Sequence, residues 1–310
     1  MKSLATALAV TIAAAAAAQT TPDLELSEVV VTAPEPRYVA PTTRDQIGRV
    51  WVPVQLGDKG VFRLVLDTGA QHSAITNATA AKLGIPLDQS PKVIVHGTTG
   101  SSITPTVVLD SMLLGDLMLQ PNPLPVVADV FGGADGLLGI EGLENHRIFI
   151  DFRHDVINIS RSKNAAAQRG FSALHFLPGP EQLPVVKARV GNVDVRAVID
   201  TGSQATIGNE ALRTALRKQR RYNGNEGEED RVLGATGQWQ TGVGLNLSPV
   251  YLGSLVVRNA HVTFADLHIF DHWGLNDQPA MVIGMDLIGL VDQLVIDYRR
   301  GELQIKPRSR

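Results

Sequence analysis

The sequence contains no cysteine among its 310 residues. Disulfide bridges, thiolate nucleophiles, cysteine-ligated zinc, iron–sulfur clusters and a lipid-modified cysteine are therefore excluded. An excess of one charge is also lacking, because 28 Lys and Arg residues oppose 31 Asp and Glu residues and leave a net charge of −3. Nucleic-acid-binding domains are usually strongly basic, so no nucleic-acid partner is expected. With 44% hydrophobic and 19% charged residues, the composition is that of an ordinary globular protein.

Several common enzyme signatures are missing as well. The sequence has no Gly-x-Ser-x-Gly nucleophile turn, no His-Glu-x-x-His zinc motif and no Gly-Lys-Ser/Thr phosphate loop. After residue 18 no segment is apolar enough to cross a membrane, so no transmembrane anchor is expected in the mature chain. We expect neither a cofactor nor a metal ion.

The N-terminus has the pattern of an export signal. Lys2 precedes an uncharged, mostly apolar run, Leu4–Ala18, which ends in small residues before Gln19. This pattern predicts a signal peptide over residues 1–18 and an exported protein, periplasmic or secreted. The alternative is an alanine-rich helix that is not removed. Residues 19–48 are rich in Thr, Pro and Glu and predict an extended linker with one short β run, Glu28–Thr32.

The remaining chain predicts an all-β body with few short helices. Turn residues separate β-branched segments, which we expect to be strands: Val52–Leu56, Phe62–Leu66, Val93–His96 and Arg147–Ile150. Only two helical stretches stand out. The first is Asn77–Leu83, with Asn77 as the N-cap and Gly84 ending the helix; the second runs from Glu210 to about Arg221, after Asn209.

An internal repeat organises this body. The segment Leu64–Ala70, which contains Asp-Thr-Gly, recurs as Ala197–Ser203, 133 positions later. Four further landmarks recur in the same order, at displacements that grow to 146. They are Gly97–Gly100 with Gly234–Gly237, Ala128-Asp129 with Ala265-Asp266, Leu137–Gly139 with Val282–Gly284, and Ile150–Phe152 with Ile296–Tyr298.

The repeat predicts two homologous lobes, residues 49–162 and 183–307, joined by a linker over residues 163–182. The growing displacement places two insertions in the second copy, at 217–230 and 267–277.

The two Asp-Thr-Gly turns have a chemical explanation. Two carboxylates held within hydrogen-bonding distance cannot both ionise, so one keeps a proton. The ionised member can take a proton from water while the protonated member donates to a peptide carbonyl. Asp67 and Asp200 are therefore the candidate catalytic residues. The alternative reading is a strand followed by a tight turn, which would suffice for one isolated copy.

The other residues of both turns are candidates for supporting the pair. They are Thr68, Gly69 and Ala70 in the first turn and Thr201, Gly202 and Ser203 in the second. A Thr hydroxyl can bond across the interface, and Gly lets two backbones approach closely. We also expect the Ser203 hydroxyl to donate to the carboxylate pair, which Ala70 cannot do, and the pH optimum to lie between strongly acidic and neutral.

These turns, each followed by an apolar-apolar-Gly segment, resemble the aspartic proteases, specifically a bacterial, exported, retropepsin-like member. The resemblance covers about residues 49–307. It implies the acid-protease fold, in which two β-barrel-like lobes enclose a cleft, and catalytic roles for Asp67 and Asp200. Retroviral relatives assemble the site from two identical chains, whereas here both halves lie in one chain, as in pepsin.

The resemblance also implies flaps over the cleft. The candidate flap residues are Gly97, Thr98, Thr99 and Gly100 in the first copy, and Gly234, Ala235, Thr236 and Gly237 in the second. Pepsin-type enzymes carry a tyrosine on the first flap, but residues 96–108 contain none, and Trp239 is the aromatic residue near the second. We therefore expect two retropepsin-type flaps.

Three further groups of charged or metal-binding residue types have simpler explanations than a functional site. His268 and His272 are spaced as metal ligands on a helix, but they lie in an insertion and we favour no metal. His72 follows the first turn and can reach the rim of the cleft, although a surface or packing role is the simpler explanation. The basic run Arg217–Arg221 fits a solvated helix end better than a binding site for an acidic partner.

The favoured hypothesis is an aspartic endopeptidase that acts on peptide or protein substrates. The rival is a protease-like module that binds peptides without cleaving them, and a third possibility is that residues 19–48 cover the cleft as a pro-segment. A monomer is expected and a dimer is left open.

Overall fold

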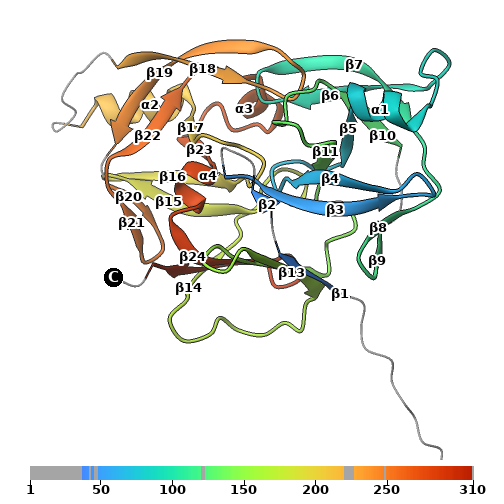
Figure 1. Cartoon of the computed structure of the whole chain (residues 1–310). Helices are drawn as coiled ribbons and strands as arrows, with labels where there is room; N and C mark the ends of the chain where they lie inside the picture. The colour runs from blue at the N-terminus through green and yellow to red at the C-terminus, as the bar shows by residue number, and fades with distance from the viewer. Residues whose placement is uncertain are drawn as a thin grey trace, which may run out of the picture. The chain divides into compact units, whose positions relative to one another are not determined.

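The computed structural model describes residues 37–41, 43–44, 48–119, 123–219, 227–247 and 249–308. The chain from Glu35 to Arg310 forms one compact unit. Most of its regular structure is β-strand, arranged in three sheets (Figure 1). The predicted signal peptide and the β run Glu28–Thr32 lie outside the described residues.

The first lobe is built on one mixed sheet with the strand order β6-β7-β10-β5-β11-β4-β3-β8-β9. A short strand, β2 (Thr43–Arg44), pairs with β3. The strands are β3 (Val50–Leu56), β4 (Val61–Leu66), β5 (Ala74–Thr76), β6 (Lys92–Gly97), β7 (Gly100–Val107), β8 (Met112–Leu114), β9 (Leu117–Leu119), β10 (Leu124–Val127) and β11 (Gly136–Leu138).

The second lobe repeats that sheet strand for strand, in the order β18-β19-β22-β17-β23-β16-β15-β20-β21. The strands are β15 (Val185–Val190), β16 (Val193–Ile199), β17 (Ile207–Gly208), β18 (Glu228–Leu233), β19 (Trp239–Leu247), β20 (Val250–Leu252), β21 (Leu255–Val257), β22 (Ala260–Phe264) and β23 (Ala280–Ile283). The prediction of an all-β fold with two homologous lobes is confirmed.

A six-stranded sheet joins the lobes at the bottom of the view in Figure 1, in the order β1-β13-β12-β24-β25-β14. Its strands are β1 (Arg37–Pro41), β12 (His146–Asp151), β13 (Val156–Arg161), β14 (Ser172–His175), β24 (Val291–Asp297) and β25 (Glu302–Pro307). The two lobes meet where β12 pairs antiparallel with β24. β1 and β14 occupy matching outer positions, so the structural repeat extends beyond the segments that share sequence motifs.

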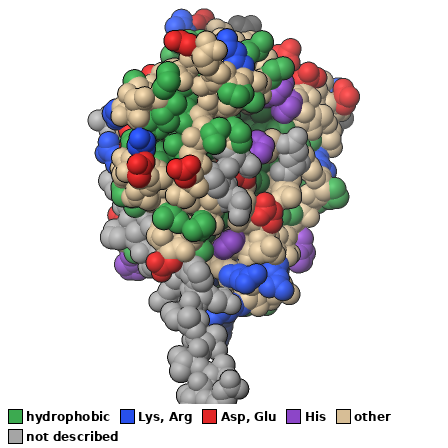
Figure 2. All heavy atoms as spheres, turned by 90° about the vertical axis from the view of Figure 1, so that its right-hand side faces the viewer, with side chains coloured by type: hydrophobic (Ala, Val, Ile, Leu, Met, Phe, Trp, Pro, Cys, Tyr) green, Lys and Arg blue, Asp and Glu red, His purple; other side chains and the backbone are tan. Residues whose placement is uncertain are grey.

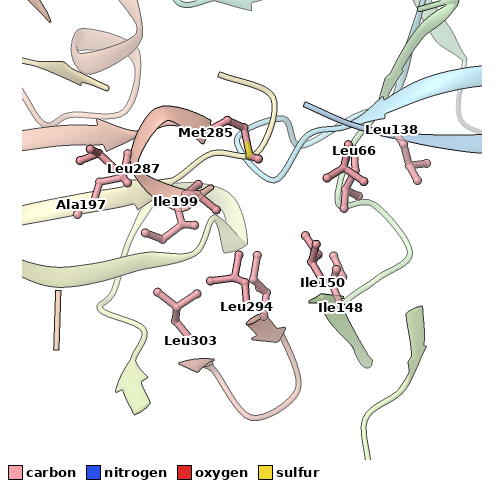
Figure 3. Close-up of a cluster of buried hydrophobic side chains, with 14 of the residues drawn as sticks. Leu66, Leu138, Ile148, Ile150, Ala197, Ile199, Met285, Leu287, Leu294 and Leu303 are labelled. Atoms are coloured by element: carbon pink, nitrogen blue, oxygen red, sulfur yellow. The ribbon is translucent and has the colours of Figure 1, made fainter. Parts of the chain in front are cut away.

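The hydrophobic core is continuous between the lobes. Leu66 and Ile150 from the first lobe belong to the same buried cluster as Ile199 and Leu294 from the second (Figure 3). These four side chains are at most 3% exposed. Since one core supports both repeats, the ends of β4 and β16 are held in a fixed relation.

Four short helices occur in the described part of the chain, in addition to a 3₁₀ turn, Pro180–Gln182. The helices are α1 (Asn77–Leu83), α2 (Glu210–Arg217), α3 (His268–His272) and α4 (Met285–Ile288). α1 has the predicted bounds and ends at Gly84. Its N-cap is Thr76, however, and not Asn77, because the Thr76 hydroxyl accepts from Thr79 N.

The second predicted helix begins as expected, since the Asn209 side chain accepts from Leu212 N at 2.9 Å. It ends at Arg217, about four residues early. α3 and α4 were not predicted from the sequence. α3 lies in the second predicted insertion, at residues 267–277, beside the hairpins at the top of Figure 1.

Candidate active site

Each Asp-Thr-Gly turn begins where a buried strand leaves the core. Asp67 follows β4, whose last three residues are fully buried, and its N–H donates to Leu138 O at 2.9 Å. Asp200 follows β16 in the same way, and its N–H donates to Ile283 O at 3.0 Å. The apolar-apolar-Gly segments of the repeat, on β11 and β23, are therefore the strands that hold the two turns in place.

Thr68 and Thr201 tie the two turns to each other. Thr68 N–H donates to Thr201 Oγ1 at 3.2 Å, and Thr201 N–H donates to Thr68 Oγ1 at 3.1 Å. Each hydroxyl in turn donates across the interface, Thr68 to Ile199 O and Thr201 to Leu66 O, both at 2.7 Å. Both threonines are fully buried. This crossed network fixes the separation of the turns.

The glycines of the turns let the two carboxyl groups face each other. A Cβ atom on Gly69 would lie 2.5 Å from Asp200 Cγ, and one on Gly202 would lie 2.2 Å from Asp67 Cγ. No side chain fits at either position. The structure thus brings both aspartates together, with a hydrogen bond between their side chains.

The surroundings favour a proton on this pair. Burial raises the pKa of Asp67 well above its ordinary value, and the neighbouring charge of Asp200 raises it further. Burial also raises the pKa of Asp200. Against this, Gly202 N–H and Ser203 N–H donate to Asp200 Oδ1 at 2.8 and 3.0 Å, whereas Asp67 Oδ1 receives one such bond, from Gly69 at 3.0 Å. Because donors stabilise the charged form, these hydrogen bonds oppose the rise in the pKa more strongly at Asp200 than at Asp67.

The predicted role of the Ser203 hydroxyl is wrong. This hydroxyl donates to Ala205 O at 2.9 Å, and the backbone N–H of Ser203 reaches Asp200 instead. In the first turn, Ala70 N–H donates to the carbonyl oxygen of Asp67 at 3.4 Å. The two turns do differ electrostatically, but the difference arises from the direction of a backbone N–H.

A further layer of support was missed by the sequence interpretation. Ser73 Oγ accepts from Gly139 N, and Ser73 N–H donates to Glu141 Oε1 at 2.7 Å. In the second lobe, Thr206 Oγ1 accepts from Gly284 N, and Thr206 N–H donates to Asp286 at 3.0 Å.

These four residues follow the repeat, since Thr206 and Asp286 lie 133 and 145 positions after Ser73 and Glu141. Those are the displacements of the neighbouring landmarks, so the alignment of the two copies could have found them. Burial raises the pKa of both Glu141 and Asp286.

The two candidate flap turns meet at the ends of the β6–β7 and β18–β19 hairpins (Figure 1). Thr99 Oγ1 donates to Gln238 O at 2.8 Å, and the Gln238 side chain donates to Ser101 O at 3.4 Å. Gly97 and Gly234 lie against residues of the opposite tip, Thr236 and Thr99 respectively. Both hairpins are therefore in a closed arrangement.

The carboxyl pair opens onto a cleft of about 550 Å³ beneath the hairpins. The first lobe provides a largely apolar wall, which includes residues 93–95, Pro125 and Leu137. The second lobe contributes three residues of the α3 region, Ile269, His272 and Trp273. His72 also lines this cleft.

The charges on the molecular surface are mixed. Figure 2 views the side of the first lobe, where acidic and basic side chains are interspersed among hydrophobic ones. In the described part of the chain, no group of three or more His, Asp or Glu side chains is placed to hold a metal ion. No helix among the described residues is long and apolar enough to cross a membrane.

The two repeated sheets and the paired Asp-Thr-Gly turns are those of the acid-protease fold, with an aspartate pair where the two lobes meet. A model of the aspartyl protease family matches residues 52–141 and 186–287, one stretch in each lobe and more than half of the chain together. The chain therefore belongs to the aspartyl protease family. Comparison with curated proteins gives no match.

Proposed function

We propose that the protein is an aspartic endopeptidase that hydrolyses peptide bonds with a water molecule activated by Asp67 and Asp200. The observation that supports this proposal best is the facing pair of carboxyl groups, whose pKa values are both raised. A pair that holds one proton contains both an acid and a base, which peptide hydrolysis needs at the same time.

In the proposed reaction, Asp200 is the ionised member. It takes a proton from a water molecule, whose oxygen attacks the peptide carbonyl carbon, while Asp67 donates its proton to the carbonyl oxygen. The neutral tetrahedral intermediate then breaks at the C–N bond as a proton passes to the departing amine. Asp200 gives the amine nitrogen the proton that it took from water, and Asp67 takes a proton from one hydroxyl group of the intermediate, so the pair again holds one proton, on Asp67.

The cleft is suited to a peptide substrate. Its volume of about 550 Å³ lies in the usual range of ligand sites, and its apolar wall can bury hydrophobic side chains. Residues 93–98 of β6 and its turn line the same cleft as Asp67 and Asp200, so an extended peptide can lie between the first hairpin and the carboxyl pair. The two flap turns would then close over the substrate.

The enzyme is proposed to be exported and monomeric. Residues 1–18 would act as a signal peptide, and the mature chain would work as a monomer in the periplasm or outside the cell. The lobes at 49–162 and 183–307 would act together, with 163–182 as their linker. In the pro-segment hypothesis, residues 19–48 cover the cleft. Within that range, β1 (Arg37–Pro41) pairs with β13 in the joining sheet and therefore does not lie in the cleft.

The direct test uses purified mature protein with a peptide library between pH 3 and pH 8. Wild type should cleave a subset of peptides, and the Asp67→Asn and Asp200→Asn variants should lose cleavage by at least about a thousandfold. Cleavage that survives in either variant would refute the roles of the pair. If wild type binds library peptides and cleaves none at any pH, the rival function, a peptide-binding module, is correct.

A further inference from the structure

Three histidines from both lobes stack on one another at the edge of the cleft. His96 lies on β6, and His268 and His272 lie on α3. The ring centroids of His96 and His272 are 3.9 Å apart with an interplanar angle of 8°, and those of His96 and His268 are 5.2 Å apart at 12°. His96 Nδ1 and His268 Nε2 are hydrogen-bonded at 2.9 Å.

This cluster links the first hairpin to the second lobe. Beside it, Ile269 N–H on α3 donates to Thr98 O at 3.3 Å. His96 and His272 both line the cleft, and residues 93–98 form part of its wall. The position of the first hairpin therefore depends on contacts with α3 as well as on the contact between the two hairpin tips.

We propose that His96 is a positioning residue that, with His268 and His272, forms a latch between the lobes, and that protonation of these histidines releases the first hairpin from α3. The role of this latch in peptide entry rests on the proposed function. The latch itself is a property of the fold and can be tested without a substrate.

The hydrogen bond between two imidazoles sets the condition for release. One nitrogen must donate and the other must accept, so His96 and His268 can keep the bond with at most one positive charge between them. If both rings are protonated, both nitrogens carry hydrogen and the rings repel each other. Histidine is the side chain that ordinarily changes charge between about pH 5 and pH 8. The closed hairpin is therefore stable near neutral pH and is released in acid.

Few other charged groups lie on the elements that carry or contact the three histidines. In the described part of the chain, β7 and β10 pack against β6 and carry no titratable residue. Besides His96, the titratable residue of β6 is Lys92. On the α3 side, Asp266 precedes the helix, and Asp271 accepts a hydrogen bond from Asn276 at 3.3 Å.

The face-to-face stacking of His96 on His272, with ring centroids 3.9 Å apart, argues against a metal ion shared by all three histidines. Nitrogen lone pairs lie in the plane of each ring, so two stacked rings do not direct them to one point between the rings. This agrees with the lack of a metal-binding group among the described residues.

The first test measures the distance between the hairpin and the second lobe. Because the chain has no cysteine, spin labels can be attached at two introduced sites, Ile103→Cys on β7 and Asp277→Cys after α3. Both positions are exposed. Double electron–electron resonance spectroscopy should show a longer distance between the two labels at pH 5 than at pH 7.

Two variants of the labelled protein separate the latch from general acid effects. The His268→Gln change should abolish the pH response, because glutamine takes up no proton. The His175→Asn change removes a histidine on β14 in the joining sheet and should leave the response intact. An unchanged distance between pH 7 and pH 5 would overturn the proposal, as would a pH response that persists in His268→Gln.

The second test uses a cleaved peptide. The His96→Phe variant keeps an aromatic ring on His272 but loses the hydrogen bond, and it should raise KM at pH 7 about three- to tenfold with kcat little changed. In His268→Gln, the pH dependence of KM should flatten, while the pH profile of kcat, set by the aspartates, stays as in wild type. If kcat and KM change equally in both variants, a general structural role explains the histidines. A pH-dependent distance without cleavage by wild type would refute the proposed function and leave the latch standing.

Discussion

Replacing Thr68 with valine removes one hydroxyl group from the crossing between the lobes and nearly preserves the shape of the side chain. The hydroxyl accepts from Thr201 N–H at 3.1 Å and donates to Ile199 O at 2.7 Å. Thr68→Val therefore leaves one donor and one acceptor without partners in a fully buried place. Each such group costs about 1–3 kcal/mol, so we expect the free energy of unfolding to fall by about 2–6 kcal/mol.

The two-fold repeat adds a stricter expectation. Thr201 makes the same two bonds in the opposite direction, at 3.2 and 2.7 Å. Thr201→Val should therefore destabilise the protein by the same amount as Thr68→Val, within about 1 kcal/mol. Urea unfolding followed by circular dichroism measures both changes, and Thr214→Val on the exposed face of α2 is the matched control, expected within about 0.5 kcal/mol of wild type. A loss below about 0.5 kcal/mol in either buried variant would refute the crossed network.

Three further predictions concern the carboxyl pair. Burial raises the pKa of Asp67 in the folded protein, so ionisation of the pair lowers the stability of wild type as the pH rises. Asp67→Asn should therefore resist urea better than wild type at pH 7, and the two proteins should be equally stable near pH 3, where wild type is protonated. Gly202→Ala should reduce kcat by more than about a hundredfold, because its Cβ would lie 2.2 Å from Asp67 Cγ, and a crystal structure of the variant should show the two carboxyl groups moved apart. Ala70→Ser should leave the acid limb of the pH–rate profile in place, because the matching Ser203 hydroxyl donates to Ala205 O; a downward shift would show that a hydroxyl at position 70 does reach the pair.

The central features of the site could be predicted from the sequence because they are local and repeated. A strand, a tight turn and a following apolar-apolar-Gly segment recur in order, and the displacement of each motif identifies its counterpart. The structure places Asp67 and Asp200 face to face at these turns. It also places the candidate flap glycines, Gly97 and Gly234, at two hairpin tips that meet.

Features that depend on side-chain direction could not be predicted. Whether the hydroxyl or the N–H of Ser203 faces Asp200 depends on the path of the turn. Two hydrogen bonds set this path: Met285 N–H donates to Ser203 O from far along the chain, and the Ser203 hydroxyl donates to Ala205 O, just after the motif. β14 has no sequence motif in common with β1, although the two strands occupy equivalent edges of the joining sheet.

The histidine cluster was hidden for a similar reason. His268 and His272 form a recognisable pair at helical spacing in the sequence, but their partner is His96, which lies 172 positions before His268. Only the closure of the first hairpin over the cleft brings that residue to α3. Contacts between a hairpin tip and an insertion of the other lobe leave no periodic signal in the sequence.

The central claim is that Asp67 and Asp200 share one proton, and carboxyl carbon NMR tests it without a substrate. Protein labelled with ¹³C at the aspartate carboxyl groups is titrated, and Asp67→Asn and Asp200→Asn identify the two signals by their loss. We expect one signal of the pair to titrate well above the ordinary aspartate range, because burial and the neighbouring charge raise the pKa of Asp67. Complete ionisation of both carboxyl groups below about pH 4, near the ordinary aspartate pKa, would contradict the account.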